Sequence, residues 1–178
     1  MWSTSASRDV YENPWIRVRE DQVRRPDGGA GVYGVVEVRH PAVFVVALTG
    51  AEEVLLVTVD RYTTGGPSVE VPAGGSDGED LLLAAQRELR EETGHAASEW
   101  RELGEVHSLN GVAAARGHVF LATGLEHVGG AETEAEGISA VRAVPVPELL
   151  AMVGRGEITD NESLGALLMG FVALGRVR

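Results

Sequence analysis

Three glutamates fall within five residues of the segment Arg87–Gly94, and this clustering constrains the fold more than any other feature of the chain. On an α-helix each residue turns by about 100°, which places Glu91 at about 300° and Glu92 at about 40° when Glu88 is taken as zero. The three carboxylates would then share one helical face, where like charges repel. A hard divalent cation removes this conflict, because Mg²⁺ prefers oxygen ligands and binds together with substrate phosphates. The segment therefore predicts a metal-binding helix.

A solvated helix is the alternative interpretation, since helices rich in Glu and Arg often carry only surface charge pairs. The surrounding pattern argues against it. Glycines at 74, 75 and 78 precede Glu79, and Arg-Glu-Leu-Arg-Glu-Glu-Thr-Gly follows after seven further residues. This arrangement resembles the Nudix box, G-x5-E-x7-R-E-U-x-E-E-x-G-U, in which U is a bulky apolar residue. Six fixed matches arise by chance on the order of 10⁻⁸ times per starting position.

The chain departs from the box at two positions. Only four residues separate Gly74 from Glu79, so Ala73 stands where the first glycine would fall, and His95 occupies the last apolar position. We expect the first difference to shorten the loop before the helix. The second affects packing at the helix end and leaves the chemistry unchanged.

Segments on both sides of the box resemble the ADP-ribose pyrophosphatase branch of the Nudix hydrolases. Glu70–Gly74, which reads E-V-P-A-G, is similar to the E-L-P-A-G of that branch, and Asp60–Tyr62 is similar to its strand-end motif. The resemblance implies the Nudix fold, an α/β architecture with a mixed β-sheet sandwiched between α-helices and an N-terminal β-hairpin arm. It also implies hydrolysis of the diphosphate linkage in ADP-ribose or another NDP-sugar, with Mg²⁺ as cofactor and Mn²⁺ as its substitute.

The resemblance assigns roles to individual residues. The implied metal-binding residues are Glu88, Glu91, Glu92 and, through its carbonyl, Ala73. The implied catalytic residues are Glu88, Glu91 and Arg87, with Arg87 orienting the carboxylates. The implied substrate-binding residues are Arg61, Tyr62, Glu70 and Gly74. Two further residues of the box have implied structural roles, Glu79 and Gly94.

The resemblance does not assign the general base to a single residue. Enzymes of this branch place a glutamate in the loop before the strand that corresponds to residues 118–121, whereas residues 108–117 contain no acid. The base is then Glu88 or Glu91, or one of the acids of a later segment, Glu132, Glu134 and Glu136. Two other functions stay open as well: a nucleoside triphosphate or dinucleotide pyrophosphohydrolase, and a catalytically silent Nudix-fold module that binds a nucleotide.

Hydrophobic periodicity predicts the elements around the box. Strands are expected at residues 15–20, 31–39, 43–48, 54–59, 100–109, 118–125 and 138–144. Helices are expected at 79–93, with Ser76 or Asp77 near its N-cap and Gly94 after its end, at 146–154, and after a capping box at 159–162. The first helix should bury Leu82, Ala85 and Leu89, and the last should bury Leu164, Leu167, Leu168, Phe171 and Val172.

Two parts are expected along the chain. Residues 1–40 should form a loose polar leader of 13 residues and a β-hairpin arm, and residues 41–178 should form the Nudix hydrolase domain. A hairpin has too few strands to be stable alone. We therefore expect the arm to pack on a partner subunit in a homodimer.

Composition narrows the class of partner. The formal net charge of −12 excludes a nucleic-acid backbone or an anionic membrane as the main partner. The chain contains no cysteine, which excludes a disulfide framework and a cysteine nucleophile. Neither a signal peptide nor a membrane-spanning run is evident, so a soluble, cytoplasmic protein with a small nucleotide substrate is expected.

Overall fold

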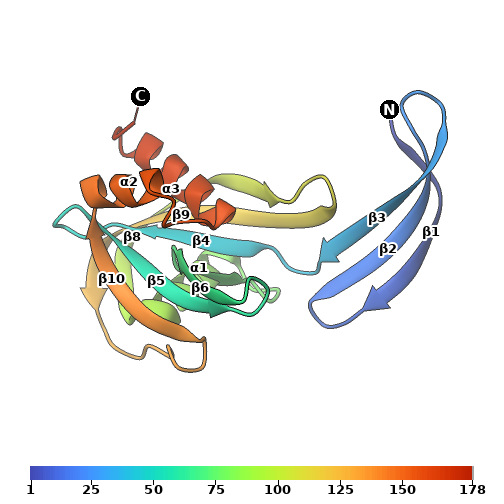
Figure 1. Cartoon of the computed structure of the whole chain (residues 1–178). Helices are drawn as coiled ribbons and strands as arrows, with labels where there is room; N and C mark the ends of the chain where they lie inside the picture. The colour runs from blue at the N-terminus through green and yellow to red at the C-terminus, as the bar shows by residue number, and fades with distance from the viewer. Residues whose placement is uncertain (178) are drawn as a thin grey trace. The chain divides into compact units, whose positions relative to one another are not determined.

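A computed structural model of the chain describes residues 1–177. The strands are β1 Ser3–Glu12, β2 Ile16–Arg24, β3 Ala30–Val38, β4 Ala42–Ala47, β5 Glu53–Arg61, β6 Gly66–Glu70, β7 Ala73–Gly75, β8 His95–Ser108, β9 Ala113–His127 and β10 Ile138–Pro145. The helices are α1 Leu81–Thr93, α2 Val146–Gly154 and α3 Asn161–Ala173 (Figure 1). No helix within the described residues is long and apolar enough to cross a membrane.

The chain divides into two compact units. Unit 1 comprises Met1–Pro41 and His107–Gly117, and unit 2 comprises Ala42–Val106 and the chain from His118 onward. The segment 107–117 was not expected in the first unit. Unit 1 is therefore formed by two segments that are far apart in the sequence.

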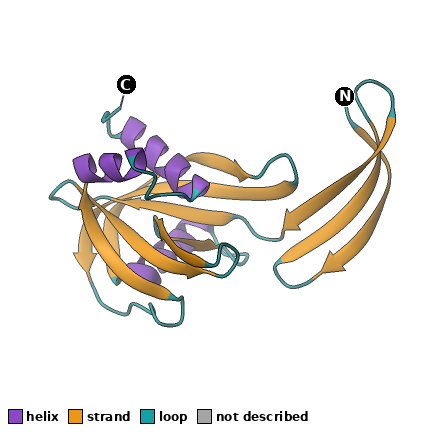
Figure 2. Cartoon of the chain, in the orientation of Figure 1, coloured by secondary structure: helices purple, strands orange, loops and turns teal. Residues whose placement is uncertain are grey.

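Unit 1 is built from strands. All of its residues are described, and none is helical (Figure 2). β2 pairs antiparallel with both β1 and β3, and β3 pairs in parallel with the start of β9, which makes the sheet mixed. The loose leader predicted for residues 1–13 is therefore wrong, because Ser3–Glu12 forms β1. Its side chains are all exposed, so the strand is held by backbone pairing and cross-strand contacts such as Arg8–Glu20, at 3.0 Å.

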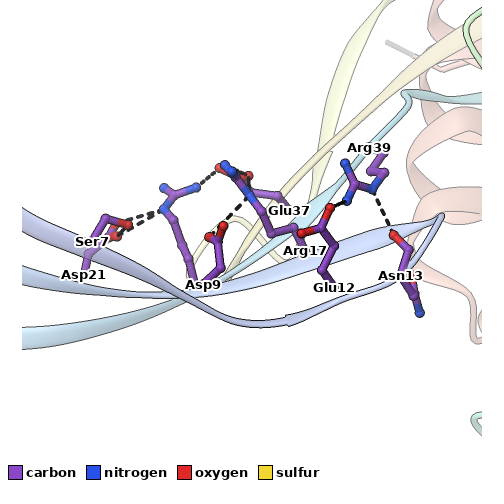
Figure 3. A network of polar contacts seen from close by, with 9 residues as sticks. Ser7, Asp9, Glu12, Asn13, Arg17, Asp21, Glu37 and Arg39 are labelled. Carbon is purple, nitrogen blue, oxygen red and sulfur yellow. Dashed lines mark hydrogen bonds and ion pairs between the residues drawn. The ribbon is translucent and has the colours of Figure 1, made fainter.

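One face of this sheet carries a network of charged side chains (Figure 3). Glu37 pairs with both Arg17 and Arg19 across the strands. Asp21 accepts hydrogen bonds from the Ser7 hydroxyl, at 2.6 Å, and from Arg19 Nε, at 3.0 Å. The Ser7 hydrogen bond is the main reason that the pKa of Asp21 is lowered; burial opposes this shift, and Arg19 adds to it. The charges of this face are thus neutralised by their own neighbours.

β4 lies at the centre of unit 2 and has both faces buried. Val43, Val45 and Ala47 belong to the core that includes α1 residues. Phe44, Val46 and Leu48, the last directly after the strand, belong to the core that includes α2 and α3 residues. Side chains of a strand alternate between faces, so β4 separates two cores. Helices therefore cover both faces, as the sandwich architecture predicted (Figure 1). A second sheet, with the order β10-β5-β6, completes the unit.

The catalytic helix predicted from the box is present, with a different start. Asp80 caps α1 by accepting hydrogen bonds from the N–H groups of Leu82 and Leu83, at 3.0 and 3.3 Å. The predicted caps, Ser76 and Asp77, are therefore wrong. The predicted end is confirmed, since Gly94 stops the helix with φ of 71°, a conformation that glycine adopts without strain.

The buried stripes differ in part from those predicted. On α1, Ala85 and Leu89 are buried but Leu82 is 37% exposed, because the buried face begins at Ala84 in the next turn. On α3, Leu167 and Phe171 are buried. The exposed members of the predicted stripe, at 58% and 59% exposure, are Leu168 and Val172.

The orientation of α3 follows from one close contact. A Cβ on Gly170 would lie 2.8 Å from Val46 Cγ1, so the missing side chain lets the helix backbone approach β4. Ala166 and Gly170 therefore face the core together with Leu167 and Phe171, whereas Leu168 and Val172 turn outward.

Candidate active site

Two glutamates of the box lie within the buried face of α1. Glu88 is 7% exposed and Glu92 is 6% exposed. Glu92 Oε2 accepts a hydrogen bond from the N–H of Ala73 at 2.9 Å. A Cβ on Gly74 would lie 2.2 Å from Glu88 Oε1, so only glycine leaves room for this carboxylate. The backbone of β7 therefore shapes the surroundings of both carboxylates.

Arg87 donates hydrogen bonds to three carboxylates of the box. Its Nη1 donates to Glu88 Oε1 at 2.7 Å and to Glu91 Oε2 at 3.1 Å, and its Nε donates to Glu79 Oε2 at 3.2 Å. Its Nη2 donates to the carbonyl of Gly75 at 2.9 Å. Partial burial disfavours the guanidinium, but Glu88, Glu91 and Glu79 together raise the pKa of Arg87.

Burial raises the pKa values of Glu88 and Glu92. It raises the pKa of Glu92 to about 8, with the nearby charge of Glu88 adding to the shift and the N–H of Ala73 opposing it. Burial also raises the pKa of Glu88, against the attraction of Arg87. Two carboxylates in such surroundings strongly favour a positive partner.

A second ion pair lies within electrostatic reach of this cluster. Arg61 donates from Nε and Nη2 to the two carboxylate oxygens of Glu70, at 3.0 and 2.6 Å. The hydrogen bonds with Glu70 are the main cause of the raised pKa of Arg61; burial opposes it, and the charge of Glu92 contributes. Tyr62 is 99% exposed. The structure thus brings Arg61 and Glu70 toward the cluster and leaves Tyr62 outside.

An acidic segment after β9 also reaches the site. The N–H of Glu132 donates to the carbonyl of Glu91 at 2.7 Å. Among the three acids of this segment, Glu136 is the one whose charge contributes to the raised pKa values of Glu88 and Glu92. Gly94 also lies at this end of α1, and its carbonyl accepts the N–H groups of residues 128 and 129.

One neighbour of the site, Ser163 on α3, was not predicted from the sequence. Its hydroxyl accepts the N–H of Val71, two residues before Ala73. The capping pattern at 159–162 predicted the start of the helix, but nothing in that pattern predicts a contact with residue 71.

The residues present fit a divalent cation by their chemistry. Their donors are carboxylate oxygens, which Mg²⁺ and Mn²⁺ prefer. The pKa values of Glu88 and Glu92 are raised chiefly by burial, and the charges of neighbouring carboxylates add to the shift. As the side chains lie, no group of three or more Asp, Glu or His within residues 1–177 is assembled around one point. Arg87 supplies the positive charge instead.

A separate cleft of about 690 Å³ lies in unit 1. Its lining residues are Arg17, Glu37, Val38, Arg39, His40, Pro41, His107, Ala114 and Arg116. Two of the arginines are already paired: Arg17 with Glu37, and Arg39 with Glu12 (Figure 3). The cleft contains none of the box carboxylates.

Family models and curated proteins match most of the chain. Residues 2–36 match the nucleoside diphosphate sugar hydrolase N-terminal domain, and residues 38–164 match the NUDIX domain. An ADP-ribose pyrophosphatase of Mycobacterium tuberculosis is 35% identical over 170 residues, covering 94% of this chain and 82% of that protein. An ADP-ribose pyrophosphatase of Bacillus subtilis is 29% identical over 167 residues, covering 92% and 89%.

A solved structure shares the fold. The crystal structure of an ADP compounds hydrolase superimposes with a TM-score of 0.85 at 19% identity, covering 99% of this chain and 97% of that one. The NUDIX match spans most of the chain and includes the helix that carries Glu88, Glu91 and Glu92. The chain therefore belongs to the Nudix family and is a Nudix hydrolase.

Proposed function

We propose that the protein hydrolyses the diphosphate linkage of ADP-ribose or another NDP-sugar, with Mg²⁺ as its cofactor. Water attacks one phosphorus of the diphosphate, and the bond to the bridging oxygen breaks. ADP-ribose then gives AMP and ribose phosphate. The two relatives named as ADP-ribose pyrophosphatases, which this chain matches over more than nine-tenths of its length, support this choice of substrate.

The observation that carries the proposal is the pair of buried carboxylates on α1. Glu88 and Glu92 are both less than 8% exposed, and each has a raised pKa. Buried carboxylates that repel each other cost stability unless a cation or a proton neutralises them. A diphosphate substrate requires that same cation, because its own oxygens are negatively charged.

We assign the roles as follows. Bound Mg²⁺ would neutralise phosphate oxygens and lower the pKa of a water molecule. Glu88, Glu91 and Glu92 would hold the ion together with the carbonyl of Ala73. Arg87 orients Glu88 and Glu91 through its two hydrogen bonds.

Arg61 and Glu70 form an ion pair that would contact the substrate, and Gly74 leaves space for Glu88. For the base we favour Glu136, since its charge reaches both Glu88 and Glu92. The alternatives are Glu88, Glu91, Glu132 and Glu134. Comparing Glu136→Gln with Glu134→Gln tests this, because only the first should lower kcat.

A substrate panel tests the function itself. The protein is incubated with Mg²⁺ and, separately, with ADP-ribose, other NDP-sugars, nucleoside triphosphates and dinucleotides, and the products are identified by chromatography. AMP and ribose phosphate from ADP-ribose would support the proposal. Pyrophosphate released from triphosphates would favour the alternative pyrophosphohydrolase, and binding without turnover would favour a silent nucleotide-binding module.

We further propose that residues 1–40 serve as an arm for a homodimer, beside a Nudix hydrolase domain at 41–178. Large apolar side chains remain exposed in the arm, at 51% to 71% exposure: Trp2, Val10, Tyr11, Trp15 and Val32. Such exposure in a thin sheet favours burial against a second copy. Sedimentation at micromolar concentration should give the mass of a dimer, and a monomer would contradict this assignment.

A further inference from the structure

The connection from β6 to β7, Glu70–Ala73, is held from several sides. The N–H of Val45 in β4 donates to the carbonyl of Pro72 at 2.8 Å. The N–H of Ala73 donates to Glu92 on α1 at 2.9 Å. The N–H of Val71 donates a hydrogen bond to Ser163 on α3. The position of the connection therefore depends on three different elements of unit 2.

Ser163 provides the contact from α3. Its Oγ accepts the N–H of Val71 at 3.1 Å, and both residues are buried, at 1% and 0% exposure. A buried backbone N–H requires a partner, because no water can replace a lost hydrogen bond there. The hydroxyl of Ser163 is thus the group that keeps Val71 in place.

Ser163 is itself held at the first turn of its helix. Asp160, the N-cap of α3, accepts the N–H of Ser163 at 2.7 Å. Asp160 is also one of the charges that raise the pKa of Arg61. The start of α3 therefore lies within electrostatic reach of the Arg61–Glu70 pair.

The connection between Val71 and Ala73 is stiff. Pro72 has a fixed φ, and the residue before a proline is restricted to extended conformations. We expect a displacement of Val71 to be passed along the backbone. It would move the N–H of Ala73, which orients Glu92 Oε2.

We propose that Ser163 is a positioning residue for the cation site: its hydroxyl holds Val71, and the stiff connection through Pro72 keeps the Ala73 N–H directed at Glu92. The inference rests on the proposed function, in which Glu92 binds the metal ion. Groups that hold a ligand side chain from behind affect metal affinity even though they do not touch the ion. The start of α3 would thereby tune a site formed by α1 and β7.

The test compares Ser163→Thr with Ser163→Val in the full chain. Thr and Val have nearly the same shape, so the two variants differ in the hydroxyl. Mn²⁺ affinity is measured by calorimetry, and kcat is measured at saturating Mn²⁺. We expect Ser163→Val to bind Mn²⁺ about 10-fold more weakly than Ser163→Thr. At saturation its kcat should return to the value of Ser163→Thr.

Two controls separate this role from general destabilisation. Leu167→Ala removes a buried side chain of the same helix, so it should lower the thermal midpoint without changing Mn²⁺ affinity. Glu92→Gln should lose Mn²⁺ affinity. Equal Mn²⁺ affinity of the Thr and Val variants, with Glu92→Gln impaired, would overturn the role of Ser163 alone. Unchanged affinity of Glu92→Gln would overturn the metal site and this inference together. If Ser163→Val fails to fold, Ser163→Ala replaces it in the same comparison.

Discussion

Glu88 Oε1 lies 2.2 Å from the position that a Cβ on Gly74 would occupy. The carboxylate therefore occupies the space that a side chain at residue 74 would need. Glycine is required here for space, since its φ lies outside the left-handed region.

Gly74→Ala should displace the carboxylate of Glu88. We expect a loss of about 1–3 kcal/mol in the free energy of unfolding from overpacking. We also expect kcat/KM to fall by about 100-fold, because a catalytic group moves by roughly 1 Å. Urea unfolding and steady-state kinetics measure the two effects. Gly50→Ala is the control, since nothing lies within 4 Å of its added Cβ, and wild-type activity in Gly74→Ala would contradict the role of this contact.

Glu88→Gln and Glu92→Gln should separate activity from stability. Each substitution keeps the volume and removes the charge that a cation needs, so turnover should fall by several orders of magnitude. Without metal, Glu92→Gln should be more stable than the wild type at pH 8 by about 1 kcal/mol or more, because one unit of pKa corresponds to about 1.4 kcal/mol. Chelator-treated protein in urea measures this gain. Retained turnover in both variants would show that the glutamates only form a solvated helix surface.

The pKa of Glu92 predicts proton release on metal binding. In the metal-free protein this pKa is raised from 4.5 to about 8. The folded state therefore keeps a proton that the unfolded state has lost between these values, and its stability falls as the pH rises through them. A cation displaces that proton, so about one proton should be released at pH 6.5 and almost none at pH 9. Calorimetry in buffers of different ionisation enthalpy counts the protons; equal release at both pH values would contradict the assignment.

Arg87 should matter for both fold and activity. It donates to Glu79, to Glu88, to Glu91 and to a backbone carbonyl. Arg87→Gln should cost about 1–2 kcal/mol after allowance for solvent screening, and kcat should fall because Glu88 loses its orienting partner. Arg90→Gln is the matched control, since Arg90 is more exposed and its ion pair with Glu91 is 3.7 Å long. Similar losses in both variants would point to a general charge effect.

Asp21 should make the arm sensitive to acid. Its pKa is lowered, chiefly by the hydroxyl of Ser7 and further by Arg19, against the effect of burial. A lowered pKa contributes stability that is present above the ordinary value of 3.8 and is lost as the pH falls through the folded value. Asp21→Asn should therefore destabilise the arm at pH 7 and reduce its loss of stability in acid. Limited proteolysis of β1 and β2 at a series of pH values measures the stability of the arm. Asp9→Asn, at an exposed position, is the control.

Much of the fold could be predicted because its elements have clear periodicity. Val43–Leu48 and Val54–Val59 are apolar runs of strand length, and both form buried strands. The 146–154 helix follows its proline as expected. By contrast, β1 was missed because a strand with only exposed side chains has no apolar alternation. β7 was missed because three residues are too few to show a pattern.

The candidate site also has features that could be predicted from the sequence and features that could not. The box identified the carboxylates, since their spacing along one helix is written in the sequence. The buried positions of Glu88 and Glu92 could not be predicted, because a charged residue is expected at the surface. The contact between Ser163 and Val71 joins residues 92 positions apart, and only the packing of α3 beside β4 creates it.

The alternation of β4 has a consequence for how such a chain can change over generations. Val45 faces the helix of the box, and Val46 faces Gly170 on α3. Inserting or deleting one residue within β4 would exchange the two sides, so each side chain would meet the opposite core. Point substitutions can be absorbed one core at a time, but length changes cannot. Insertions and deletions in divergent descendants should therefore accumulate in surface loops and spare residues 42–47.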